Sequence, residues 1–209
     1  MIKELQVQGV FAENTYFYID DHSRSGFLID PGAQAGLIHD VIVRNGWTIE
    51  KILLTHGHFD HIGAAELLRE KLLAPIYIYP EDAKYLTDPY LNLSANSGRP
   101  ITVAHYEELY DGEVIRLKSN SGFYLKVMHT PGHTPGSVTY YSPEEEAAFV
   151  GDLLYQHGPG LTHFPGGNRR ILEESIVNKI LTLPTDTVLL SGHSSPITVG
   201  EERRMLLRD

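Results

Sequence analysis

The sequence contains no cysteine among its 209 residues. Disulfide bridges, thiolate metal ligands and a cysteine nucleophile are therefore excluded, and any metal site must use nitrogen and oxygen donors. The sequence also lacks an apolar run of the roughly 18 to 20 residues that a membrane-spanning helix needs. Its first residues, MIKELQVQG, do not have the basic and then apolar layout of a signal peptide. These absences predict a cytoplasmic protein with no membrane partner.

Positive charge is scarce, because 17 Lys and Arg residues stand against 27 Asp and Glu, for a formal net charge of -10. Proteins that bind nucleic acids usually carry a basic face, so we expect no nucleic-acid partner, and a nuclease is disfavoured. The hydrophobic share of 42% is ordinary for a folded soluble protein. We expect one globular domain over residues 1–209 and a small-molecule substrate.

Short apolar runs alternate with helical patterns along the chain. In the first half, a helix is expected over 33–45, with Gly46 as its cap, and strands are expected at ELQVQGV, NTYFYID, GFLID, KILLT and PIYIY. A second helix is expected at GAAELLREKLL, and a loop or lid over 87–104. In the second half, helices are expected near 170–181 and after Ile197, with strands at YLKVMHT, SVTYYS, AAFVGD and TVLLSG. This alternation predicts an α/β fold built as a sandwich of two sheets.

The densest group of potential ligands lies in THGHFDHIGA, between the predicted strand KILLT and a predicted helix. A loop can direct neighbouring side chains to opposite sides, so His56 and His58 can reach one ion while Asp60 and His61 turn toward another. The alternative is a solvated polar loop. Leaving so many imidazoles unpaired would be costly if the site were buried, so the density favours a metal.

Three more potential ligands each follow an apolar strand, and a glycine precedes each of them. They are His133 in TPGHTPG, Asp152 in FVGD and His193 in LLSGH. Functional groups of α/β proteins gather where strands end on one rim of a sheet. Together these residues would add one His to each ion and a carboxylate that can bridge both.

The motifs THGHFDH, GHT, GD and GH, in this order, resemble the metallo-β-lactamase superfamily over essentially the whole chain. The resemblance implies an αββα sandwich, in which two face-to-face β-sheets are flanked by helices and the metals lie at one edge. It also implies a first metal held by three histidines, a second held by two histidines and an aspartate, and a bridge between them. The implied ligands are His56, His58 and His133 for the first, Asp60, His61 and His193 for the second, and Asp152 for the bridge.

Such a site permits hydrolysis. Two divalent ions about 3.5 to 4 Å apart can share a water and lower its pKa to about 7, which produces a hydroxide nucleophile. Asp60 can orient this hydroxide as well as bind a metal. Nitrogen and oxygen donors suit zinc or iron, with manganese possible. Thioesters suit the site because a thiolate, whose conjugate acid has a pKa of about 8.5, leaves without a general acid.

The segment GDLLYQHGPGLTHFPGGN is similar to that of small glyoxalase II-like hydrolases. The resemblance implies thioester hydrolysis of the hydroxyacylglutathione type. It also places Leu161 where relatives usually have an Arg or Lys, which binds glutathione in full-length glyoxalase II. Arg169 and Arg170 are the nearest candidates to hold an anionic substrate group, although they could equally be exposed residues of a first helical turn. His157 and His163 could line the pocket mouth or lie in solvent.

Asp30, in the IDPG turn, resembles a position of the family that hydrogen-bonds beneath the metal loop, and Thr55 could act there too. Alternatively, Asp30 organises the bend before Pro31.

Two other functions compete with hydrolysis. A more distant resemblance to persulfide dioxygenases is matched by His56, His133 and Asp152, a set that mononuclear iron could use. A non-enzymatic metal-binding module is the third possibility, but a structural zinc is normally closed by four ligands.

Overall fold

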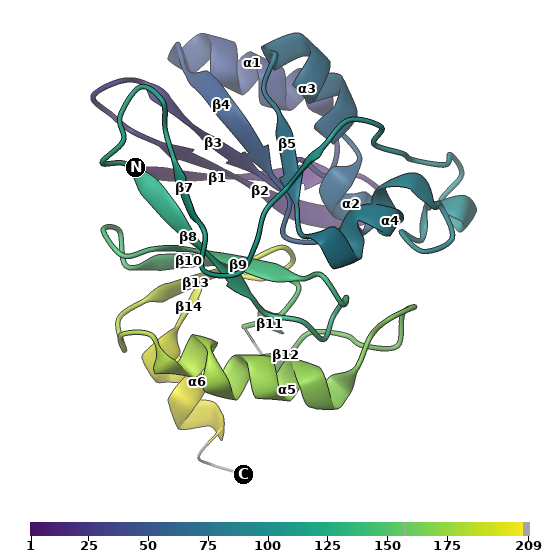
Figure 1. The fold of residues 1–209 in the computed structure, drawn as a ribbon, viewed down its shortest axis with the longest axis vertical. Helices are drawn as coiled ribbons and strands as arrows, with labels where there is room; N and C mark the ends of the chain where they lie inside the picture. Colours follow the sequence, from purple (N-terminus) through teal and green to yellow (C-terminus); the bar gives the residue numbers. More distant parts are fainter. Residues whose placement is uncertain (157, 207–209) are drawn as a thin grey trace.

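The computed structural model describes residues 1–156 and 158–206, which form two six-stranded sheets packed face to face (Figure 1). The first sheet contains, in spatial order, β1 (Ile2–Gln8), β2 (Ala12–Ile19), β3 (Ser25–Ile29), β4 (Thr48–Leu53), β5 (Ile76–Ile78) and β6 (Glu107–Glu108). Strands β1 to β3 are antiparallel neighbours, while β3 to β6 run parallel. The parallel strands therefore end on the same edge of the sheet.

The second sheet has the order β14 (Ile197–Thr198), β13 (Val188–Ser191), β10 (Ala147–Gly151), β9 (Val138–Ser142), β8 (Tyr124–His129) and β7 (Val114–Arg116). Its strands β7 to β10 form an antiparallel meander, and β10 pairs with β13 in parallel. A separate small hairpin, β11 (Leu154–Tyr155) with β12 (Gly158–Pro159), follows β10 directly. Both β10 and β13 thus end on one edge of this sheet.

Helices cover the outer face of each sheet. Figure 1 shows α1 (Ala35–Asn45) and α3 (Ala65–Leu72) over the first sheet, and α5 (Arg169–Asn178) and α6 (Val199–Leu206) over the second. The two-sheet sandwich that the sequence pattern predicts and the αββα arrangement that the family resemblance implies are both confirmed. Short helices make the connections: α2 (Phe59–Ile62), η1 (Pro80–Asp82), α4 (Ala83–Thr87), η2 (Ser94–Asn96) and η3 (Ile180–Thr182). Within the described ranges, every helix is too short or too polar to pass through a bilayer.

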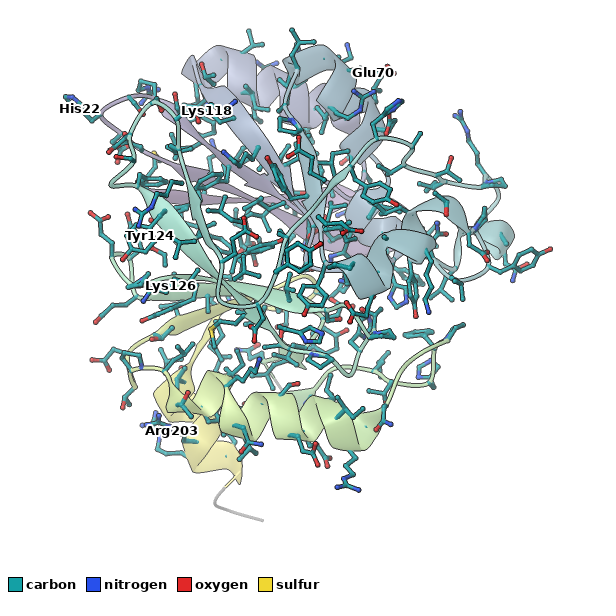
Figure 2. All side chains as sticks on the ribbon, viewed as in Figure 1. His22, Glu70, Lys118, Tyr124, Lys126 and Arg203 are labelled. Atoms are coloured by element: carbon teal, nitrogen blue, oxygen red, sulfur yellow. The ribbon has the colours of Figure 1, made fainter. Side chains whose placement is uncertain are left out.

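Buried apolar side chains fill three layers, of which the middle one lies between the sheets. There Tyr18 stacks on Phe123 with ring centroids 4.1 Å apart. Alternation along β8 directs Leu125 toward this layer, while Tyr124 and Lys126 lie on the other side of the strand. Figure 2 labels both and shows side chains occupying the space between the two sheets. This packing fixes the position of one sheet relative to the other. The strand ends of both sheets therefore lie at a common edge of the sandwich.

Most predicted elements are present within a few residues of their predicted ends. Helix α1 ends where predicted, and Gly46 adopts the left-handed conformation, with φ 62°, that favours glycine at this position. Strands β6, β7 and β14 were not predicted because two or three residues are too few to show alternation. One local expectation was wrong, since Asp60 and His61 lie on the short helix α2 and not on a loop.

Candidate metal centre

Seven potential ligands from distant parts of the chain meet at the edge where β4, β10 and β13 end. His56 and His58 follow β4, and Asp60 and His61 lie on α2. Each remaining ligand follows a strand of the second sheet: β8 leads to His133, β10 to Asp152 and β13 to His193. The sequence predicts this convergence, and the structure brings all seven residues together.

His56, His58 and His133 form a cluster that we call the all-imidazole group. Their donor atoms lie within 4.8 Å of one another, and all three side chains are buried. The His58 Nδ1 and His133 Nε2 atoms are 2.8 Å apart. Burial, reinforced by the neighbouring imidazoles, lowers the pKa of His56 and lowers that of His58 to about 3. Both rings are therefore neutral near pH 7, which is the form that binds a metal.

Asp60, His61 and His193 form a second cluster, which we call the mixed group. The His193 Nε2 atom lies 3.3 Å from both Asp60 Oδ2 and His61 Nε2. Burial opposes the charging of His61, but the carboxylates of Asp152 and Asp30 outweigh it and hold the pKa of His61 well above its ordinary value. The pKa of His193 is also raised against the effect of burial, through its hydrogen bond to Asp60. Negative charge around the mixed group thus favours a cation at this position.

Asp152 lies between the two groups. Its Oδ1 is 3.3 Å from His61 Nε2, and its Oδ2 is 3.6 Å from both His133 Nε2 and His193 Nε2. Tyr155 donates its hydroxyl hydrogen to the same Oδ2 at 2.9 Å. One carboxylate therefore faces both groups, as a bridging ligand must.

Outer hydrogen bonds orient the imidazoles. His133 donates from Nδ1 to the carbonyl oxygen of Leu161, and His193 donates from Nδ1 to that of Ala12, both at 2.7 Å. His61 Nδ1 similarly faces Asp30 Oδ2 at 2.9 Å. In each ring the other nitrogen, Nε2, faces the cluster, which is the arrangement typical of metal-binding histidines.

Several buried polar atoms have no hydrogen-bond partner within the described part of the chain. Among the ligand-type residues they are His56 Nε2, His58 Nε2 and Asp152 Oδ1. Unpaired polar atoms are costly in a protein interior, and a cation would satisfy donors of this kind. Gly192 packs so closely on His61 and Asp152 that a Cβ atom there would clash with both. The residues present therefore fit bound divalent metal.

Asp30 and Thr55 lie beneath the cluster. The Asp30 carboxylate accepts hydrogen bonds from the Thr55 amide at 2.7 Å and the Thr55 hydroxyl at 2.6 Å. The Thr55 hydroxyl oxygen is also 3.1 Å from His56 Nδ1. Asp30 has a φ of 48°, which is an uncommon backbone conformation for a residue other than glycine. Together, Asp30 and Thr55 contact one histidine of each group, His61 and His56.

Two buried carboxyl groups near the ligands were not predicted. Asp82 accepts hydrogen bonds from the Gly57 amide at 2.8 Å, and from the Thr134 hydroxyl and the Gly136 amide at 2.7 Å. It thus ties the loop of His56 to the loop of His133. Because it follows the predicted strand PIYIY on the same rim as the ligands, the strand-end rule could have found it.

The second unpredicted group is Glu13 on β2. Its Oε1 lies 4.0 Å from His61 Nδ1, on the side away from His193. Burial raises the pKa of this carboxyl well above its ordinary value. No sequence pattern indicates such a position, because the residues around Glu13 resemble any other strand start.

A cavity of about 870 Å³ opens onto the metal centre. His58, Asp60, His133, Asp152 and His193 form one side of it, and apolar residues make up most of the rest. Some of its coordination positions can therefore be reached by a substrate, which distinguishes the site from a closed structural metal site.

The predicted substrate arginines lie elsewhere. Arg169 and Arg170 are exposed on the first turn of α5, where they bind Glu173 at 2.6 Å and Glu174 at 2.9 Å, and neither lines the cavity. The structure therefore does not bring them to the metal centre, and the simple alternative of exposed helix residues describes them.

The two loop histidines have different outcomes. His163 is exposed and contacts Phe164 with ring centroids 4.1 Å apart and the ring planes tilted by 41°, so it lies beside the cavity wall without being part of it. His157 falls outside the described residues.

Comparison with known proteins agrees with this geometry. The model of the metallo-beta-lactamase superfamily matches residues 8–193. A probable metallo-hydrolase of Bacillus subtilis, YqgX, is 40% identical over 93% of this chain and 91% of its own length. The hydroxyacylglutathione hydrolase GloC of Haemophilus influenzae is 34% identical over the same shares of the two chains.

Two solved structures extend the likeness to the fold. The B3 metallo-beta-lactamase BLEG-1 superposes with a TM-score of 0.91 and 39% identity, covering 98% of this chain and 97% of that one. TTHA1623, solved in a di-iron-bound form, has a TM-score of 0.83 and 32% identity, with 97% of each chain covered. The fold is therefore shared with a metallo-beta-lactamase and with a protein solved in a di-iron-bound form.

Proposed function

The chain belongs to the metallo-beta-lactamase superfamily as a metal-dependent hydrolase, and from this premise we propose that it hydrolyses thioesters with two divalent ions. The ions would occupy the all-imidazole group and the mixed group, with Asp152 shared between them. The observation that carries this proposal is the position of that carboxylate, within 3.6 Å of imidazoles from both groups.

When bound, the metals would supply an activated water and would polarise the substrate carbonyl. The protein holds the donors in place. Asp60 lines the cavity and is tied to His193, so its carboxylate can orient the attacking water. Zinc and iron both suit these nitrogen and oxygen donors. The likeness to a protein solved in a di-iron-bound form supports iron.

A thioester requires no general acid from the protein, because the thiolate leaves unprotonated near neutral pH. The Tyr155 hydroxyl is the only phenol on the described cavity wall, and it already donates to Asp152. The name of the Haemophilus relative, a hydroxyacylglutathione hydrolase, supports the same class of reaction.

The test is a panel of acyl thioesters that includes S-lactoylglutathione, offered to protein loaded in turn with zinc, iron and manganese. We expect release of free thiol, measured with a thiol-reactive dye, and its loss after chelation and recovery on reloading. Matched oxygen esters and one β-lactam complete the panel, the latter because BLEG-1 is described as a metallo-beta-lactamase. Absence of thiol release above the chelated control with every metal would refute the proposal.

Persulfide oxidation by one iron is the competing outcome. It would use His56, His133 and Asp152 and would leave the mixed group without a function. Oxygen uptake with glutathione persulfide, together with one iron per chain, would replace the hydrolase proposal with this one.

A further inference from the structure

The cavity wall away from the metal centre is mostly apolar. Its apolar side chains are those of Val10, Phe11, Phe59, Leu93, Leu161 and Phe164, and Asn96 and Ser97 add a polar portion. Among these, Val10, Phe11 and Leu161 are 60%, 57% and 50% exposed. Single exposed apolar side chains are ordinary on a protein surface, but a cluster of them around one cavity marks a binding surface.

The apolar residues are held against the metal ligands. The Leu161 carbonyl oxygen accepts the Nδ1 hydrogen of His133 at 2.7 Å, so the backbone that carries this side chain is fixed to a ligand. The Phe164 ring lies edge-on to His58, with centroids 5.4 Å apart. A substrate whose carbonyl carbon reaches the metal centre would therefore place its neighbouring groups against Leu161 and Phe164.

The described wall of this cavity contains no Lys or Arg. Its only formal charges besides the histidines are the carboxylates of Asp60 and Asp152, which face the metal centre. An anionic group that entered the apolar part would lose hydration without gaining a cationic partner among the described wall residues. The cavity is thus poorly suited to a thiol carrier that brings its own carboxylates.

We propose that this cavity binds thioesters with an uncharged, apolar acyl group of medium length, in preference to hydroxyacyl thioesters of an anionic thiol. The reaction rests on the function proposed above, whereas the binding preference follows from the wall itself. The acyl chain lies along Leu161 and Phe164, and the apolar side chains at Val10 and Phe11 cover its far end.

Binding is tested first, on full-length metal-loaded protein with thioethers that cannot be hydrolysed. Calorimetric titration compares S-methyl- and S-hexyl-N-acetylcysteamine, which differ only by five methylenes, and S-methylglutathione, which adds charge. We expect the hexyl compound to bind at least about tenfold more tightly than the methyl compound, well below the limit for full burial of five methylenes. Equal affinity of the two neutral compounds, or tighter binding of S-methylglutathione than of the hexyl compound, would overturn the proposal.

The variant Leu161→Arg tests the wall directly, because it places a cation on a backbone already fixed to His133. We expect the hexyl compound to bind at least about threefold more weakly and S-methylglutathione to bind more tightly. The control is Val43→Arg, which adds the same charge at an exposed position of α1 away from the cavity. Circular dichroism verifies that both variants fold. Identical changes in the two variants would refute the role of Leu161.

Kinetics separate this inference from the proposed reaction. Among N-acetylcysteamine thioesters, kcat/KM should rise from acetyl to hexanoyl and should exceed the value for S-lactoylglutathione. Fast turnover of S-lactoylglutathione with no gain from the longer acyl chain would leave thioester hydrolysis in place and overturn the binding preference. Tight, Leu161-dependent binding of the hexyl thioether without any turnover would uphold the preference and overturn the hydrolase function.

Discussion

The all-imidazole group and the mixed group lie side by side, yet they differ in burial and in the pKa of their imidazoles. His56, His58 and His133 are buried, and burial keeps the pKa of each imidazole low. In the mixed group, the His193 side chain is 21% exposed, and carboxylates raise the pKa of its imidazole. The first group is therefore a set of neutral, buried donors, and the second is a charged set that includes the partly exposed His193, while both groups border the cavity.

The difference shows how one site can combine rigid binding with access. A neutral group binds metal without releasing protons, and the very low exposure of His58 and His133 on the cavity wall should slow the removal of a metal by a chelator. The mixed group must exchange protons for its metal, but its open side faces the cavity, where a substrate arrives. Because Asp152 contacts both groups, we expect metal binding at one group to affect metal binding at the other.

The largest effect should come from Asp152→Asn, which removes the negative charge that faces both groups and replaces one carboxylate oxygen by an NH2 group. We expect thioesterase activity to fall about 1000-fold or more and metal content to fall, as measured by thiol release and by elemental analysis. Asp186→Asn, an exposed position away from the cavity, is the control and should change neither quantity. Retention of activity and of metal content in Asp152→Asn would mean that the two groups act independently.

The next effect distinguishes the groups by removing one ligand from each. His58→Ala should leave an ion in the mixed group, and His193→Ala should leave one in the all-imidazole group. Because the mixed group is more exposed, we expect a chelator to remove the remaining ion of His58→Ala about tenfold faster than that of His193→Ala. Stopped-flow measurement with a chromogenic chelator gives the rates, and the reverse order would contradict the comparison.

Asp82→Asn should affect the all-imidazole group selectively, because Asp82 ties the loops that carry its ligands. An amide cannot accept from three donors as the carboxylate does, so we expect the free energy of unfolding to fall by about 1–3 kcal/mol. Urea denaturation of the metal-free proteins measures this loss. The control is Glu50→Gln, whose carboxylate accepts hydrogen bonds from two exposed backbone amides. An equal loss of unfolding free energy in this variant would show that the effect is not specific to Asp82.

The same variant gives a pH dependence with a definite sign. Burial raises the pKa of Asp82 from 3.8 to about 6, so between these values the folded protein binds a proton that the unfolded chain does not. Stability from this group therefore increases as pH falls from about 7 to 4. The stability gap between wild type and Asp82→Asn should widen over that range by up to about 3 kcal/mol. A gap that stays constant or narrows would contradict the pKa shift.

The smallest effect should come from Tyr155→Phe, which removes one hydrogen bond to Asp152 on the side of the mixed group. We expect kcat to fall about fivefold, equivalent to about 1 kcal/mol for one hydrogen bond, while metal content stays unchanged. Assay at saturating substrate, alongside elemental analysis, separates these quantities. Loss of metal in this variant would show that the phenol holds the bridge in place and does more than tune it.

The ligands themselves could be predicted because each one follows a local pattern, an apolar strand and a turn, that topology converts into a shared edge. Arg169 and Arg170 illustrate the limit of that approach. Their sequence, RRILEE, already has the spacing of i and i+4 ion pairs on a helix, and these local pairs hold both side chains on α5. A search of the sequence for i, i+4 ion pairs would have excluded both arginines as candidate substrate-binding residues.

The apolar wall could not be predicted in the same way. Phe11, Leu93 and Leu161 come from three connections that share no pattern, and only tertiary packing places them around one cavity. Apolar residues in the turn between β1 and β2 were the one available signal, because turns are usually polar. Glu13 also lacked a signal, since its burial depends on α2 and the His61 ring and not on its own strand.

The hydrogen bond from His193 to the Ala12 carbonyl joins residues 181 positions apart. Asn14 adds two contacts of the same reach, to the carbonyl oxygens of Ser191 and Ser194. The last ligand is therefore oriented by the first hairpin of the chain, and a polypeptide still emerging from the ribosome has no complete mixed group. Assembly of the mixed group is thus a late event in biogenesis, and a metal at this position would be held only after the last strands have joined the first hairpin.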